Sequence, residues 1–207
     1  MEKILATTRQ ELLRLKRQLL EVRAGYRLLE QKRDSLIKAF MQLKGEFLEK
    51  KEKLFNDLKE VIKVYDFSIK TNPAAFFDAF SNHFQSKKLI IDSKTQSIMG
   101  VKTIVFSVES FEPPQINSEG LPKSFVIALQ KFSKLLPKLI ELASIEDALI
   151  KLALAIEKTR RRVNVLKDIV MPSLRQQIKY INLKLADQER ESLVFNLKFK
   201  EKRQKSS

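Results

Sequence analysis

The chain has 207 residues, no cysteine, one histidine and four glycines, and its formal net charge is +15 at pH 7. These totals exclude disulfides, cysteine-ligated zinc and any catalytic or metal centre that needs two imidazoles. No glycine-rich phosphate loop is present, and no apolar run is long enough to span a bilayer. Because residues 1–13 also lack an apolar signal core, we expect a cytoplasmic protein. The missing phosphate loop and metal-ligand clusters lead us to expect that it binds no cofactor.

The positive charge is concentrated at the two ends of the chain. Residues 1–35 hold nine basic and five acidic side chains, and residues 158–207 hold fourteen and five. Residues 36–157 are nearly balanced, with seventeen against fifteen. If the two ends lie together, they form one basic tip suited to an acidic protein, a nucleic acid or an anionic membrane surface.

A single long helix is predicted from about Thr8 to about Phe67, because no proline interrupts residues 1–72 and apolar residues alternate at spacings of three and four. This is the heptad seam of a coiled coil. After Phe47 the spacing slips, and the stripe is expected to continue at Leu54, Phe55, Leu58, Ile62 and Tyr65. The seam residues before the slip include Leu15, Leu19, Val22, Tyr26, Leu29, Leu36 and Phe40.

Two residues of this helix break local rules. Arg33 takes a seam position, where it could meet an acidic partner, set the register or extend its charged head to solvent. Gly25 stands in the helix interior, where glycine costs up to about 1 kcal/mol relative to alanine. We expect Gly25 to allow close approach of a second helix rather than to bind a ligand.

The middle of the chain has a different composition. Asn72 and Pro73 are typical of a helix start, so a short amphipathic helix is predicted there. The β-branched stretches "KKLIID" and "VKTIVFSVES" flank the turn-like "SKTQSIMG" and predict a β-hairpin, and residues 112–122 are expected to form a loop. His83 is interpreted as a surface or module residue. The short helix carries Phe76, Phe77, Phe80 and Phe84, which could form a module core or a docking face.

The last third repeats the helical pattern from Ser124, with Pro137 as a kink or a restart. An extra residue enters the seam near Val170, and such an insertion locally unwinds a supercoil. Pro172 is expected on the outward face as the kink of one continuous helix, or else at the first position of a new helix. The seam residues of this segment include Ile156, Val163, Leu166, Val170, Leu174, Ile178 and Ile181.

Two long helices joined through a small module must run antiparallel. We therefore predict an all-α protein, a long antiparallel two-helix coiled coil with a small mixed module of one short helix and a β-hairpin. The expected divisions are residues 1–69 for the first helix, 70–123 for the module, and 124–207 for the second helix with a basic tail.

These features resemble a known family. Residues 8–37, "TRQELLRLKRQLLEVRAGYRLLEQKRDSLI", and residues 135–202, with "KTRRRVN" and a later proline, resemble the two helices of the D subunit of V-type and archaeal-type ATPases. The "IMGV" stretch at Ile98–Val101 is similar to part of its central module. Thr7 departs from the family, which usually has proline there, although threonine can still cap a helix.

The resemblance implies a non-catalytic rotor axle, with its paired ends inside a hexamer of catalytic and regulatory subunits that alone binds ATP. Its middle would meet the F subunit of the rotor and the socket subunit above the proteolipid ring, on the cytoplasmic side of the membrane. Module docking is then expected at Phe76, Phe77, Phe80 and Met99. The expected hexamer contacts are Arg160, Arg161, Arg162, Arg9, Arg14, Arg17 and Lys179.

Alternatives remain at this stage. The three consecutive arginines could instead be a solvated basic face without a strong contact. A basic coiled coil could also bind nucleic acid, although the chain has no aromatic stacking platform or docking motif. A membrane-surface scaffold would need an exposed apolar face opposite the basic one, whereas helix pairing is expected to use the apolar stripe.

Overall fold

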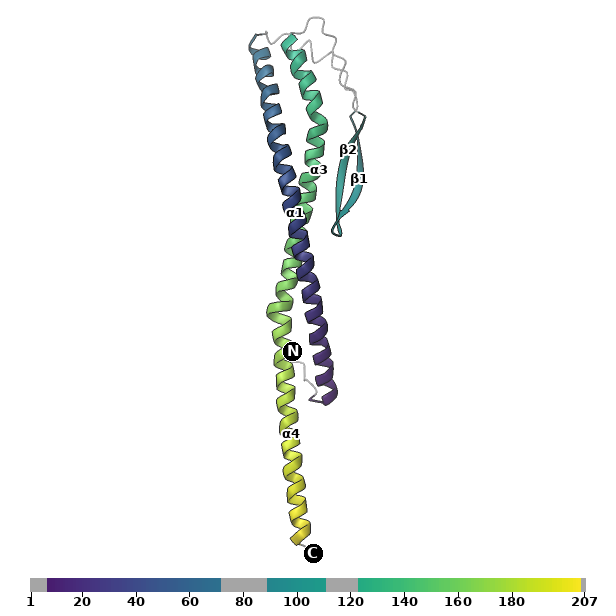
Figure 1. Cartoon of the computed structure of the whole chain (residues 1–207), viewed down its shortest axis with the longest axis vertical. Coiled ribbons are helices and arrows are strands. Elements are labelled where there is room, and N and C mark those ends of the chain that lie inside the picture. The colour runs from purple at the N-terminus through teal and green to yellow at the C-terminus, as the bar shows by residue number, and fades with distance from the viewer. Residues whose placement is uncertain (1–6, 72–88, 111–122, 206–207) are drawn as a thin grey trace. The chain divides into compact units, whose positions relative to one another are not determined.

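The computed structural model describes residues 7–71, 89–110 and 123–205. The chain divides into two compact units, Met1–Asp34 with Glu157–Ser207, and Ser35–Ile156. Each unit combines a part of the first long helix with a part of the second (Figure 1). The predicted short helix after Asn72 and the loop at 112–122 lie outside the described residues.

Helix α1 (Arg9–Thr71) is one uninterrupted helix of 63 residues. The backbone N–H of Glu11 donates to Thr8 Oγ1 at 3.2 Å, and the N–H of Leu12 donates to the Thr8 carbonyl oxygen at 3.1 Å. Thr8 therefore satisfies donors of the first turn, which have no partner within the helix. The predicted start is confirmed, but the capping residue is Thr8 and not Thr7.

The second helical segment is continuous from Lys123 to Lys205, in the order α3 (Lys123–Val165), the π-helical turn η1 (Leu166–Val170) and α4 (Met171–Lys205). Pro137 lies inside α3, so the alternative of a helix restart there is wrong. The predicted continuity through Pro172 is confirmed. Pro172 is half-buried, so its expected place on the outward face is only partly correct. A kink at Pro172 stays a prediction.

Turn η1 explains the extra seam residue. The N–H of Met171 donates to the carbonyl oxygen of Leu166, five residues earlier, so this turn takes one residue more than an α-turn. Pro172 follows directly, and in a regular α-helix its ring would clash with the carbonyl four residues earlier. The wider turn η1 therefore lies at the position where the Pro172 ring would clash with the backbone. It also accommodates the inserted residue, which in a regular α-helix would turn the later seam residues away from α1.

In the unit of residues 1–34 and 157–207, α1 and α4 pack through an apolar seam. Leu15, Leu174 and Ile181 are buried together. The helices run antiparallel, because Arg9 pairs with Glu189 at 2.7 Å near the start of α1, whereas later residues of α1 lie beside the end of α3 and η1. The half-buried residues packed on this core are Leu12, Leu19, Val22, Val170, Ile178 and Leu185.

In the unit of residues 35–156, α1 and α3 also run antiparallel. Leu54 and Val61 of α1 are buried against Leu135 of α3, with Leu58, Leu139 and Leu142 packed around them. Exposed ion pairs join the two helices along their length: Lys50–Glu141 at 2.6 Å, Asp57–Lys138 at 3.0 Å and Glu60–Lys131 at 3.5 Å. Residue numbers rise on one helix as they fall on the other, which defines the antiparallel register.

The apolar stripe predicted after Phe47 is partly wrong. Leu54 and Leu58 face the core as expected. Phe55, Ile62 and Tyr65 are instead 55%, 48% and 42% exposed, and the buried residue of that turn is Val61. Residues one position apart are about 100° apart on a helix, so the predicted stripe mixed two separate faces.

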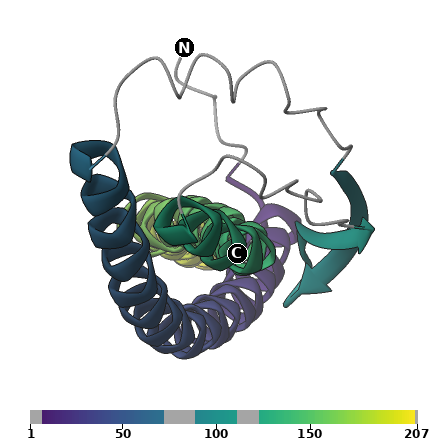
Figure 2. The same cartoon turned by 90° about the horizontal axis from the view of Figure 1, so that it is seen from above.

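Strands β1 (Ile90–Ile98) and β2 (Val101–Ser110) form the predicted antiparallel hairpin, a two-stranded ribbon in Figures 1 and 2. The turn is only Met99–Gly100, with φ of 51° and 81°. Positive φ at both positions is the two-residue turn that matches strand twist. The longer turn predicted over residues 93–100 is therefore wrong, because residues 93–98 pair as strand.

Ser144 of α3 attaches the hairpin to the helix. Its Oγ accepts the N–H of Phe106 at 2.9 Å, and its hydroxyl lies 3.3 Å from the Phe106 carbonyl oxygen and 3.0 Å from that of Ile140. Both backbone groups of Phe106 therefore face α3 and not β1. Ser144 is 6% exposed, so its contact with Phe106 is partly shielded from solvent.

Gly25 does not have the expected role. A Cβ atom built on Gly25 would meet nothing within 4 Å, and the same holds for Gly45. Neither glycine is needed for close approach of another helix, so the sequence-based interpretation of Gly25 is wrong. The entropic cost of glycine in α1 remains without a compensating contact.

Candidate partner-binding surface

The three consecutive arginines occupy an exposed arc of α3. Thr159 and Val163, which flank them, are 8% and 2% exposed and belong to the buried face. Arg160, Arg161 and Arg162 lie between these buried positions, and all three are exposed. Successive residues point about 100° apart, so the three guanidinium groups cover a wide arc rather than one flat patch.

Carboxylates within the chain already engage three of the seven predicted contact residues. Arg161 pairs with Glu157 one turn earlier, and Arg9 pairs with Glu189. Arg14 donates to both carboxylate oxygens of Glu11, at 2.9 and 2.6 Å, and this hydrogen bonding raises the pKa of Arg14. Exposed ion pairs of this kind contribute little to stability, about 0–1 kcal/mol each.

The other four basic residues are available to engage a partner. Among the residues that the structure describes, Arg17, Arg160, Arg162 and Lys179 form no ion pair, and all four side chains are exposed. An unpaired, flexible cation loses less when it exchanges water for a partner carboxylate than one that must first leave an internal pair. These four residues are therefore the strongest candidates for contact with an acidic partner.

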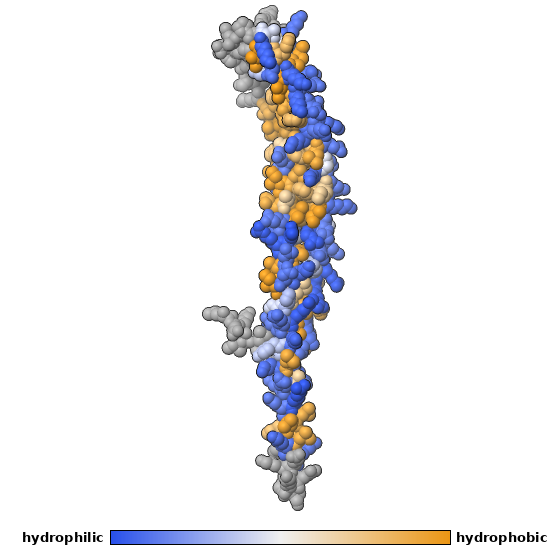
Figure 3. Space-filling model, turned by 90° about the vertical axis from the view of Figure 1, so that its left-hand side faces the viewer, coloured by the Kyte–Doolittle hydropathy of each residue, from blue (hydrophilic) through white to orange (hydrophobic). Residues whose placement is uncertain are grey.

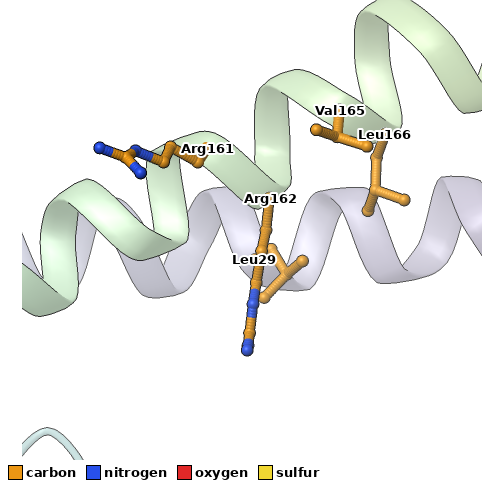
Figure 4. Close-up of a pocket in the computed structure, with 5 residues that line it drawn as sticks. All are labelled: Leu29, Arg161, Arg162, Val165 and Leu166. Atoms are coloured by element: carbon orange, nitrogen blue, oxygen red, sulfur yellow. The ribbon is translucent and has the colours of Figure 1, made fainter.

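Arg162 also borders an open depression in the same unit. The depression is lined by Leu29 of α1 and by Arg161, Arg162, Val165 and Leu166. Figure 4 shows Arg162 extending past Leu29 while Arg161 points in another direction along α3. Apolar side chains thus form its floor and the two cationic side chains stand at its border.

Arg33, the polar residue of the seam, has acidic neighbours on its own helix. Its guanidinium donates to Asp34 Oδ1 at 2.9 and 2.8 Å and lies 3.7 Å from Glu30 Oε1. Glu30 also accepts the hydroxyl of Tyr26 at 2.9 Å, which raises the pKa of Tyr26. Of the roles left open for Arg33, the structure provides the acidic partner.

The expected module-docking residues are only partly described. Met99 is 57% exposed at the hairpin turn, whereas Phe76, Phe77 and Phe80 lie outside the described residues. Of the predicted seam residues, Leu15, Leu36, Val163, Leu174 and Ile181 are at most 6% exposed. The half-buried ones are Leu19, Val22, Tyr26, Leu29, Phe40, Ile156, Leu166, Val170 and Ile178.

Sequence reasoning missed two residues that organise the structure. Met171 is 9% exposed, because η1 brings it to the buried face beside the seam residue Val170. Ser144 has no pattern in the sequence that would indicate its role, because its partners include backbone groups of a strand distant in sequence. The inserted residue near Val170 could have indicated the π turn, but the sequence offered no such indication for Ser144.

The described residues contain no group of three or more His, Cys, Asp or Glu side chains able to hold a metal ion. Among the same residues, no helix combines the length and the apolar character that crossing a bilayer requires.

Comparison with known proteins agrees with this architecture of two long helices and a hairpin. The family model for the D subunit of ATP synthase matches residues 11–201. The V-type ATP synthase D subunit of Thermoanaerobacter sp. (strain X514) is 32% identical over 94% of both chains. The V-type D subunit of Acetivibrio thermocellus is 34% identical over 94% of this chain and 89% of its own. The A-type D subunit of Pyrococcus horikoshii is 32% identical over 92% and 90%.

The protein is thus a helical stalk component rather than an isolated globular domain. The chain belongs to the family of ATP synthase D subunits. Its function is that of a central stalk subunit of a V-type or A-type rotary ATPase, and it associates with the rest of that complex.

Proposed function

We propose that this chain is the non-catalytic rotor axle of its ATPase and transmits torque between the catalytic hexamer and the ion-translocating membrane ring. The match over residues 11–201 is the observation that carries this proposal. The buried seam around Leu15, Leu174 and Ile181 supports it, because an axle must resist twisting. Burial of each such aliphatic side chain contributes about 1.5–3 kcal/mol.

The proposed partners are the catalytic and regulatory subunits of the hexamer, the F subunit of the rotor and the socket subunit above the proteolipid ring. The hexamer contacts are assigned to seven basic residues of the unit of residues 1–34 and 157–207, namely Arg9, Arg14, Arg17, Arg160, Arg161, Arg162 and Lys179. Arg160, Arg162, Arg17 and Lys179 are the principal candidates, because they form no ion pair with another described residue. Arg9, Arg14 and Arg161 would have to exchange an internal carboxylate for an external one.

The experiment compares two pairs of charge-removing substitutions. Arg160→Ala with Arg162→Ala removes two unpaired arginines of the arc, and Lys184→Ala with Lys198→Ala removes equal charge from exposed sites on α4. Hydrogen bonds to charged groups contribute about 1.5–3 kcal/mol each, so the arginine pair should weaken binding to the hexamer at least about tenfold. ATP-driven rotation should fall with it, while the thermal midpoint of the isolated chain stays unchanged.

A lowered thermal midpoint with normal rotation would show that the arginines only stabilise the coiled coil. Equal losses in the lysine pair would show that net charge, not the arc, matters. The isolated chain should show no ATP hydrolysis, and turnover by the purified chain would contradict the non-catalytic assignment. No contact among the described residues favours the nucleic-acid alternative.

A further inference from the structure

Helix α1 carries a second apolar row that the other described residues leave exposed. The row consists of every seventh residue from 41 to 69, and we name it the outer row. Its five members are 59%, 52%, 55%, 48% and 41% exposed. They are Met41, Leu48, Phe55, Ile62 and Ile69.

The outer row is distinct from the row that packs on α3. Leu54, Val61 and Ser68, each one residue earlier than a member of the outer row, are 7%, 6% and 0% exposed. One residue corresponds to about 100° around a helix, so the outer row points away from the buried row. Figure 3 shows apolar side chains forming a band over the part of the molecule that holds α3 and the later half of α1.

Two charged residues precede the outer row. The same heptad position holds Arg27 and Asp34 in the two preceding heptads, and both are exposed. Leu13 and Leu20 also occupy this heptad position and are exposed, but charged residues separate them from the outer row. Isolated exposed apolar residues are common and need no explanation, but five in succession at one heptad position form a contiguous surface. Such surfaces mark sites of interaction with another protein.

The spacing selects the structure of the partner. A seven-residue repeat is the seam of a coiled coil, and a second helix at a shallow angle can contact all five positions. A strand has a repeat of two residues and a loop has none, so neither can match this row over its whole length. The partner element is therefore a helix with an apolar seam of its own.

The charges beside the outer row indicate the polar residues of that helix. Lys38, Lys44, Lys51 and Lys59 border the row, against two acidic residues, Glu52 and Asp66. None of the four lysines forms an ion pair with another described residue, and Lys59 Nζ lies 4.4 Å from the centroid of the Phe55 ring. A second copy of this chain would place lysines against lysines, whereas a helix bordered by acidic residues is complementary.

We infer that the outer row of α1 binds one amphipathic helix of a partner subunit, with acidic residues beside its apolar seam. This inference rests on the proposed function, because it takes the partner from the same ATPase complex. It assigns that partner to a helix-to-helix contact of the coiled-coil kind along residues 41–69, and not to the basic arc of Arg160–Arg162.

The absence of cysteine from the sequence permits a direct test. Single cysteines replace Leu48, Phe55 or Ile62 in the outer row, and Glu49, Asn56 or Lys63 in the next row as matched controls on the same turns. Each chain is labelled with a maleimide, alone and in the complex purified through a tag on a hexamer subunit. All three outer-row positions should react at least about tenfold more slowly in the complex, because label enters only when the partner opens, and the controls should change little.

The same cysteines, carrying a benzophenone photo-cross-linker, identify the occupant. Cross-links from the outer row should fall on one helix of one partner subunit and step along it by about seven residues. Unchanged labelling of the outer row in a complex that contains the chain overturns the inference and leaves the proposed function intact. Equal protection of both rows, or cross-links to a second copy of this chain, also overturns it. A complex that does not contain the chain refutes the proposed function, and the inference with it.

Discussion

Two single-residue deletions can test whether η1 keeps the apolar seam aligned with α1. In a Pro172→Ala background, removal of Ile169 should convert the π turn to an α-turn while Leu174 and Ile181 keep their buried positions. Removal of Gln176, from the regular part of α4, should instead rotate all later residues by about 100°. The background substitution is needed because proline in a regular helix interior costs about 3 kcal/mol.

The structure sets the size of the expected difference. Ile181 is 0% exposed, so turning it out of the seam costs about 1.5–3 kcal/mol. The half-buried Ile178 and Leu185 turn with it and together contribute about as much again. Ile169 is 63% exposed and packs little, so its deletion should cost less than about 1 kcal/mol. The Gln176 deletion should therefore be less stable than the Ile169 deletion by about 2–5 kcal/mol.

Urea unfolding followed by far-ultraviolet circular dichroism measures the free energy of unfolding of both deletions against the Pro172→Ala chain. A control for helix content is the signal before the transition, which should be nearly the same in all three chains. Equal destabilisation by the two deletions would refute the idea that η1 absorbs an additional residue. A more stable Gln176 deletion would refute it as well.

Three further predictions follow from single contacts. Gly25→Ala should stabilise the chain by about 0.5–1 kcal/mol in urea unfolding, because a Cβ meets nothing within 4 Å, and any loss of stability would show an unseen contact. Ser144→Ala should increase hydrogen exchange of hairpin amides about tenfold, since it removes the partner of a strand N–H. Ser133→Ala, which removes a hydroxyl bonded to the Gln130 carbonyl of its own helix, should leave that exchange unchanged, and equal effects would contradict the attachment. Hydrogen bonding to Glu30 raises the pKa of Tyr26 above the ordinary tyrosine value of about 10, so the folded state holds this proton more tightly. This contact should stabilise the folded state fully below about pH 10, and its contribution should be lost as the pH rises through the raised pKa. The free energy of unfolding in urea should therefore fall less steeply above about pH 10 in Tyr26→Phe than in the unchanged chain. Identical pH profiles of the two chains would contradict the prediction.

The features that depend on local periodicity could be predicted from the sequence. The spacing of Leu15, Leu36, Leu174 and Ile181 indicated the seam, and β-branched residues indicated the hairpin. The inserted residue near Val170 indicated a local change in helix winding, which the structure realises as η1. Such patterns are readable because each is a repeat along a single element.

Features that depend on neighbours distant in sequence could not be predicted. Leu54 and Phe55 are equally apolar, and only the position of α3 decides that the first is buried and the second exposed. Gly25 gave the same pattern whether another helix approached it or not. Of the ion pairs on the candidate surface, only Arg9–Glu189 joins residues distant in sequence and could not be predicted. Glu11–Arg14 and Glu157–Arg161 have the spacings of three and four residues that a helix brings together.

The three ion pairs between α1 and α3 have a consequence for the fidelity of folding. An apolar seam with a seven-residue repeat fits almost as well after a slip of one whole heptad. Such a slip would place Lys134 opposite Lys50 in one direction, and would leave Lys50 and Asp57 opposite Ala148 and Ile145 in the other. Exposed ion pairs contribute little to the stability of the native register. Because the charges follow a different order on the two helices, however, each register shifted by a heptad has less favourable charge pairing than the native register. These surface charges therefore choose among alignments that hydrophobic burial alone leaves nearly degenerate.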